Sequence, residues 1–124
     1  MRQPIRVFLL VEAAAFAVAA LAHSGVLVHG YQHQQARIAE SLTALVLLAG
    51  LVLSRIRPGW TRPAGILAQG FALLGTLVGL FTIAVGVGPQ TAPDVAYHLG
   101  ILAVLIWGLV VAGRAPAGDP RRHA

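Results

Sequence analysis

The sequence contains no cysteine, no lysine and only four acidic residues among its 124 positions. Without cysteine, disulfides, thiolate metal sites and cysteine-based redox chemistry are all excluded. Charged residues make up only 10% of the chain, whereas 57% is hydrophobic and the mean hydropathy is +0.78. This apolar content exceeds what the core of one small soluble domain can bury, so we expect lipid to cover the remainder.

Four apolar segments are long enough to cross the hydrocarbon core of a bilayer, which takes about 20 residues of helix. They lie at residues 5–28, 36–56, 63–87 and 93–113. The connections between them are short, which predicts antiparallel neighbours. We therefore expect an all-α fold, a transmembrane bundle of four helices that run up-down-up-down. The proline, glycine and arginine content of residues 114–124 predicts a disordered cytoplasmic tail.

The first apolar segment also has an alternative interpretation. Arg2 and Arg6 precede an apolar stretch that ends at Ala20-Leu21-Ala22, a pattern that also occurs in cleavable signal peptides. However, Glu12 interrupts the stretch, and hydrophobic residues resume at 26–28. These two features favour a membrane span over a short signal-peptide core.

The arginines predict the orientation of the bundle. Of the nine, only Arg37 falls on one side of the expected membrane and all the others fall on the opposite side. Because positive residues are retained in the cytoplasm during insertion, we expect both termini there. Long apolar segments separate the arginine clusters, so the basic charge indicates membrane orientation and not nucleic-acid binding.

Polar residues recur at matching depths when positions are counted inward at about 1.5 Å per residue. The outer layer takes one residue from each segment and consists of His23, Glu40, Thr82 and His98. The inner layer consists of Glu12, Gln69 and Trp107. Ionisable groups are costly in the hydrocarbon region, so their grouping at one depth indicates a functional site.

Three chemistries fit the outer layer. His23, Glu40 and His98, with His29, Tyr97 and Asp94 expected around them, suit a divalent metal. His23 and His98 also suit the axial positions of a b-type haem. Alternatively, protons or ions move along a polar axis that Glu12, Gln69 and Thr82 extend, since an imidazole exchanges protons near neutral pH.

Several of these residues also have purely structural interpretations. His29 and His33 suit the solvated membrane boundary. Glu40 and Asp94 lie near predicted helix starts, where the helix dipole favours negative charge. Glu12 could serve only as a hydrogen-bonding link between helices.

A small-residue motif on the third segment allows close helix approach. Gly75 and Gly79 form a GxxxG, for which we favour packing within the bundle over a role in a homo-oligomer or a larger membrane complex. No Ser-His-Asp order and no phosphate loop is present in the sequence, so an enzyme is the less expected class. A membrane enzyme acting on a lipid or quinone at the outer layer is the remaining enzymatic alternative.

The second half of the chain resembles known sequences. Residues 70–89 read GFALLGTLVGLFTIAVGVGP and are followed by Asp94 and the pair Tyr97-His98. This stretch is similar to small four-span bacterial integral membrane proteins with no assigned function. The resemblance covers mainly the second hairpin; it implies a compact multi-pass protein of the bacterial inner (plasma) membrane and transfers no catalytic residues.

Together these features predict a small integral membrane protein with the lipid bilayer as its main partner. Its outward-facing His/Glu site is expected to bind a divalent metal ion or haem b. The alternatives are a component of proton or ion transport or of a channel, and a structural subunit of a larger membrane complex.

Overall fold

The computed structural model describes residues 2–117, in which the ordered elements are helices and no strand occurs. The elements are α1 (Arg2–Ser24), α2 (Gln34–Ile56), the short 3₁₀ helix η1 (Pro58–Trp60), α3 (Thr61–Ala84) and α4 (Ala92–Arg114). Each of the four α-helices is long and apolar enough to cross a membrane. The expectation of an all-helical protein with four potential spans is therefore confirmed.

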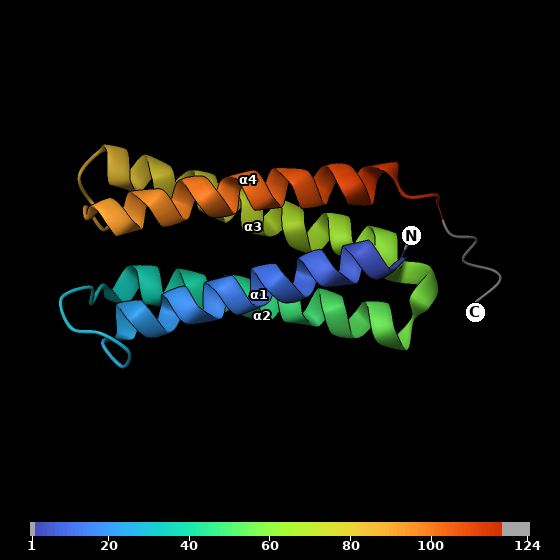
Figure 1. Cartoon of the computed structure of the whole chain (residues 1–124), viewed down its shortest axis with the longest axis horizontal. Helices are drawn as coiled ribbons and strands as arrows, with labels where there is room; N and C mark the ends of the chain where they lie inside the picture. The colour runs from blue at the N-terminus through green and yellow to red at the C-terminus, as the bar shows by residue number, and fades with distance from the viewer. Residues whose placement is uncertain (1, 118–124) are drawn as a thin grey trace.

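The four helices lie side by side along a common axis (Figure 1). Helix α1 contacts α2 and α4, and α3 contacts α2 and α4. The α1–α2 and α3–α4 connections, residues 25–33 and 85–91, lie together at one end of the bundle, which we call the two-loop end. The opposite end contains η1, the first turn of α1 and the last turn of α4.

Two helices end earlier than the sequence predicted, and glycines explain both differences. Helix α1 ends at Ser24 and not at residue 28, because Gly25 adopts a φ of +82°, outside the helical region. Helix α3 ends at Ala84 and not at residue 87, because Gly86 has a φ of +83°. All four helices begin one to three residues earlier than the predicted segments.

The end of the chain differs in part from the expected tail over 114–124. Arg114 is the last residue of α4, and Ala115 is buried against the core. The rest of the predicted tail, from residue 118 onward, lies outside the described residues.

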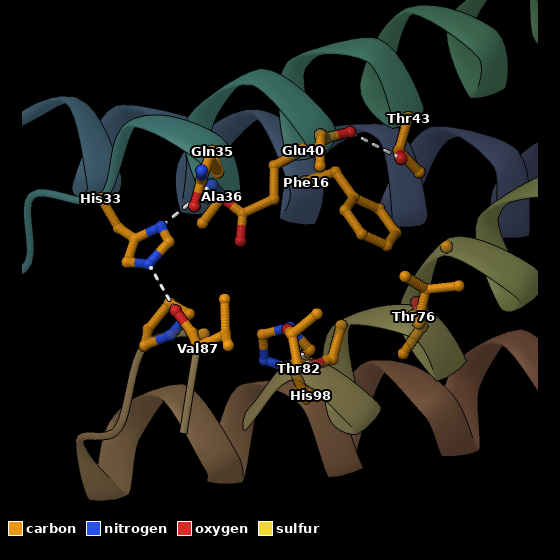
Figure 2. Close-up of a pocket in the computed structure, with 16 residues that line it drawn as sticks. Phe16, His33, Gln35, Ala36, Glu40, Thr43, Thr76, Thr82, Val87 and His98 are labelled. Atoms are coloured by element: carbon orange, nitrogen blue, oxygen red, sulfur yellow. Dashed lines mark hydrogen bonds between the residues drawn. The ribbon is translucent and has the colours of Figure 1, made fainter. Parts of the chain in front are cut away.

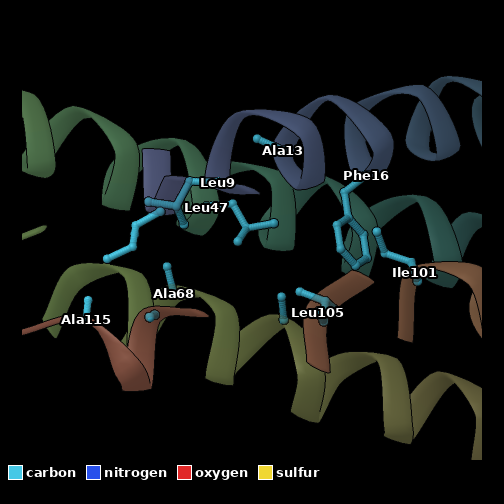
Figure 3. Packing of buried hydrophobic residues seen from close by; sticks show 11 residues of the cluster. Leu9, Ala13, Phe16, Leu47, Ala68, Ile101, Leu105 and Ala115 are labelled. Carbon is cyan, nitrogen blue, oxygen red and sulfur yellow. The ribbon is translucent and has the colours of Figure 1, made fainter. Parts of the chain in front are cut away.

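The interior of the bundle is built from small side chains and a few large ones. Leu9, Leu47 and Leu105 are fully buried and come from three different helices, and Ala68 and Ala72 of α3 complete the centre (Figure 3). Large residues of α3 and the other helices point outward instead. Helices that face lipid commonly place small residues inside the bundle and large apolar residues outside it.

Candidate functional site

A histidine bridges two carboxylates at the two-loop end. His23 is the penultimate residue of α1, and its Nδ1 lies 2.6 Å from Oε2 of Glu40 on α2. Its Nε2 lies 2.8 Å from Oδ1 of Asp94 in the first turn of α4. All three side chains are buried, with exposed fractions of 5–7%. We call these three residues the His23 cluster; they connect three of the four helices.

The two contacts define how many protons the His23 cluster holds. Each needs one hydrogen between a ring nitrogen and a carboxylate oxygen, so the cluster contains two protons. It then carries a net charge of −1, whether His23 is charged between two carboxylates or neutral beside one protonated carboxyl. Removing one proton breaks one contact, which makes the geometry dependent on proton occupancy.

Asp94 has two roles, one at the start of α4 and one in the His23 cluster. Its carboxylate accepts from the hydroxyl and the backbone N–H of Thr91, and its own N–H donates to Thr91 Oγ1, so that the two residues form a capping box at the start of α4. Its other carboxylate oxygen contacts His23. Asp94, expected as a helix-start residue in the surroundings of the site, is therefore a direct member of the His23 cluster.

A cavity of about 210 Å³ adjoins the cluster between α2 and α3 (Figure 2). We call it the α2–α3 cavity. The Glu40 side chain points into it from α2, and His98 of α4 lies on the opposite side. Oε1 of Glu40 is buried and has no hydrogen-bond partner among the described residues. Such an oxygen is costly to leave unsatisfied. It has almost no accessible surface, so a ligand or water in the cavity would reach it only after a small movement of the Glu40 side chain.

His98 is fixed by its own helix and by the small size of a glycine. Its Nδ1 lies 2.7 Å from the backbone oxygen of Asp94, which can only accept, so Nδ1 carries a hydrogen. In the neutral ring, Nε2 is then a bare acceptor. A Cβ on Gly79 would lie only 2.9 Å from this nitrogen, so Gly79 makes room for the imidazole.

His33 closes the two-loop end of the cavity, a role that the sequence did not indicate. Its Nδ1 accepts from the N–H of Ala36 and caps α2. The hydrogen must therefore be on Nε2, which lies 3.3 Å from the backbone oxygen of Val87. The α1–α2 and α3–α4 connections are thereby linked.

The structure brings together part of the predicted outer layer. His23 and Glu40 are in contact, and Glu40, Thr82 and His98 line the same cavity. His29 is exposed on the α1–α2 connection and, within the described part of the chain, has no hydrogen bond or ion pair with this group. The structure thus places His23, Glu40, Thr82 and His98 near one another, whereas His29 does not join them.

Of the predicted inner layer, Glu12 and Gln69 are buried, whereas Trp107 is 65% exposed. Both carboxyl oxygens of Glu12 are buried without a hydrogen-bond partner among the described residues. The amide nitrogen of Gln69 donates to the backbone oxygens of Gly65 and Gly108, at 3.1 and 3.4 Å. The polar axis from Glu12 to His98 therefore remains a prediction, since no hydrogen-bonded chain joins its inner and outer parts in residues 2–117.

The arrangement is less suited to the predicted metal or haem. Residues 2–117 contain no group of three or more His, Cys, Asp or Glu side chains arranged to hold a metal ion. Both ring nitrogens of His23 are engaged by carboxylates, so an iron or zinc ion could reach them only after a buried contact is broken. His98 retains one free ring nitrogen, which by itself is a single ligand.

The glycines of the GxxxG face other helices of the same chain. A Cβ on Gly75 would meet Thr43 of α2 at 3.7 Å, and one on Gly79 would meet His98 of α4. Gly75 is itself exposed, and a role of the motif in a homo-oligomer or a larger complex remains a prediction.

The chain was also compared with known proteins. No family model, curated protein or solved structure matches it. The resemblance of the second hairpin to small four-span membrane proteins therefore remains an expectation from the sequence, and the site geometry carries the functional argument alone.

Proposed function

We propose that this chain is a component of proton or ion transport in which the His23 cluster takes up and releases protons. The observation that carries this proposal is the buried imidazole of His23 between the carboxylates of Glu40 and Asp94. A change of one proton makes or breaks a contact between helices, which couples protonation to helix packing. The adjoining α2–α3 cavity supports the proposal because it is large enough to hold water.

We further propose that the helices run up-down-up-down through a bacterial inner membrane with both termini in the cytoplasm. The arginine distribution supports this orientation. At the end opposite the two loops, Arg6 donates to the backbone oxygen of Ser54, and Arg62 donates to that of Gly113. In this orientation the His23 cluster lies near the outer, non-cytoplasmic surface of the membrane.

Single cysteines test the orientation, because the natural chain has none. We expect Val28→Cys, on the exposed α1–α2 connection, to react with a membrane-impermeant maleimide added to intact cells. Gly59→Cys, in η1, is expected to react only after the cells are opened. The reverse pattern would contradict the proposed topology.

Proton flux tests the functional proposal. Purified protein in liposomes that contain a pH-sensitive dye should acidify or alkalinise the interior when a potassium gradient with valinomycin sets the membrane potential. We expect Glu40→Gln to lower this rate at least tenfold, because glutamine keeps the shape of the side chain but cannot exchange a proton at this site.

His29→Gln is the matched control, since it replaces an exposed histidine outside the cluster. Its flux should equal that of the unchanged chain. Size-exclusion profiles and helical circular dichroism establish that each variant is folded. A folded unchanged protein without flux, or a Glu40→Gln variant with full flux, would disprove the proposal.

The alternative functions predict different properties of the same preparation. A bound haem would give a Soret band, and a bound metal would give stoichiometric elemental content. A structural subunit would show neither property and no flux. The metal and haem alternatives receive less support because the nitrogens of His23 are already engaged.

A further inference from the structure

The walls of the α2–α3 cavity present hydrogen-bond acceptors and few donors. We propose that this cavity binds a small protonated amine, of the size of ammonium or a monoalkylammonium ion. The inference rests on the proposed function, because it names the class of cation that such a transport component would handle. Four observations support it.

The first observation is the carboxylate. Glu40 lines the cavity, and only 5% of its surface is exposed. Its Oε2 is engaged by His23, while its Oε1 has no partner among residues 2–117. A buried carboxylate with a free oxygen favours a cation that can donate a hydrogen bond.

The second observation is the set of cavity hydroxyls. Each donates its hydrogen to a backbone oxygen of its own helix: Thr43 to Ala39, Thr76 to Ala72 and Thr82 to Gly79, at 2.7–2.8 Å. Their hydrogens are therefore used, and only oxygen lone pairs remain for a ligand. A ligand with several N–H groups matches this arrangement, whereas an anion does not.

The third observation is the free nitrogen of His98. Its Nδ1 donates to the backbone oxygen of Asp94, which leaves Nε2 as an acceptor in the neutral ring. An imidazole nitrogen is a poor ligand for sodium or potassium but a good acceptor for N–H. Both ring nitrogens of His33, which also lines the cavity, are engaged by backbone groups, so a transition metal would find only Glu40 and His98 as available strong ligands there.

The fourth observation is the size and lining of the cavity. Its volume of about 210 Å³ admits a ligand of a few non-hydrogen atoms. Phe16 and Val78 add an apolar wall, and the Phe16 ring can also attract a cation through its face. The combination of a charged acceptor with an apolar wall fits an ammonium group that carries a short alkyl chain.

Calorimetric titration of the full chain in lipid nanodiscs tests the inference. Methylammonium chloride is the probe, and tetramethylammonium chloride is its matched control because it has the same charge and no N–H. We expect saturable binding of methylammonium and at least tenfold weaker binding of tetramethylammonium. Sodium chloride at equal ionic strength should give no binding heat.

Two variants locate the site. Glu40→Gln should weaken methylammonium binding at least tenfold. Gly75→Val should also weaken it at least tenfold by filling the cavity without removing a polar group, since a Cβ at Gly75 has ordinary contact distance to Thr43. His29→Gln should bind as the unchanged chain does.

The outcomes separate this inference from the proposed function. Proton flux without methylammonium binding would overturn the amine site and leave the transport proposal standing. Methylammonium binding that Gly75→Val does not weaken would place the ligand elsewhere and also overturn the inference. If both variants weaken methylammonium binding but the protein shows no proton flux, the amine site is supported and only the transport role is disproved.

Discussion

His23→Ala is expected to lower the free energy of unfolding by about 3–5 kcal/mol, the largest effect of any single polar substitution in this chain. The change removes the imidazole that lies between Glu40 and Asp94 and contacts both. Glu40 would remain buried without its partner, Asp94 would keep only its contacts with Thr91, and three helices would lose a shared link at the two-loop end. Equilibrium unfolding in mixed micelles, followed by circular dichroism, measures the loss.

Two further variants distinguish this explanation from a general effect of losing a side chain. His29→Ala removes an exposed histidine and should change stability by less than about 0.5 kcal/mol. The double variant His23→Leu with Glu40→Leu removes a buried pair together and should recover part of the lost stability. If His23→Ala and His29→Ala unfold alike, the bridging role of His23 is wrong.

Gly65→Ala is expected to be the most damaging of the small substitutions on α3, with a net loss of about 1–2 kcal/mol. A Cβ at Gly65 would lie 2.5 Å from Cγ2 of Ile5 on α1, which is 1% exposed. Isoleucine is stiff at its first side-chain torsion, so α1 itself must move away from α3. The same unfolding measurement reports the effect.

Gly70→Ala is the matched control on the same helix. Nothing lies within 4 Å of the position where its Cβ would be, so alanine costs no contact and gains up to about 1 kcal/mol of helix propensity. We expect stability that is unchanged or slightly raised. Equal behaviour of the two variants would contradict the close approach of α1 and α3.

The number and extent of the helices could be predicted because long apolar segments are a strong signal. The helix ends were less predictable. Hydrophobicity continues through Val28 and Val87, whereas the helices end before Gly25 and near Gly86 because these glycines take positive φ values. A hydropathy pattern carries no information on backbone torsions, so it overestimated both helices at the two-loop end.

The depth of the site residues along each helix could be predicted from the sequence. The direction in which their side chains point around the helix could not. Counting residues placed His23 and Glu40 in one layer, and their side chains are in contact. The sequence placed Asp94 only in the surroundings of the site, and a first-turn acid is already explained by capping, so its direct contact with His23 was not predicted. Only the relative rotation of α1 and α4, which the sequence does not specify, brings the two together.

For the buried residue Glu12, too, the sequence did not specify which residues surround its side chain. The sequence placed Glu12 in an inner polar layer and on a polar axis with Gln69 and Thr82. In the structure Glu12 is fully buried, and its oxygens have no hydrogen-bond partners among residues 2–117. The polar axis therefore stays a prediction.

Nitrogen-15 NMR of the histidine side chains in lipid nanodiscs tests the central claim most directly. If His23 bridges two carboxylates, both its ring nitrogens should show hydrogen-bonded shifts distinct from those of the exposed His29. Glu40→Gln should then mainly move the Nδ1 signal and Asp94→Asn mainly the Nε2 signal. A His23 spectrum that matches His29 and responds to neither substitution would contradict the account.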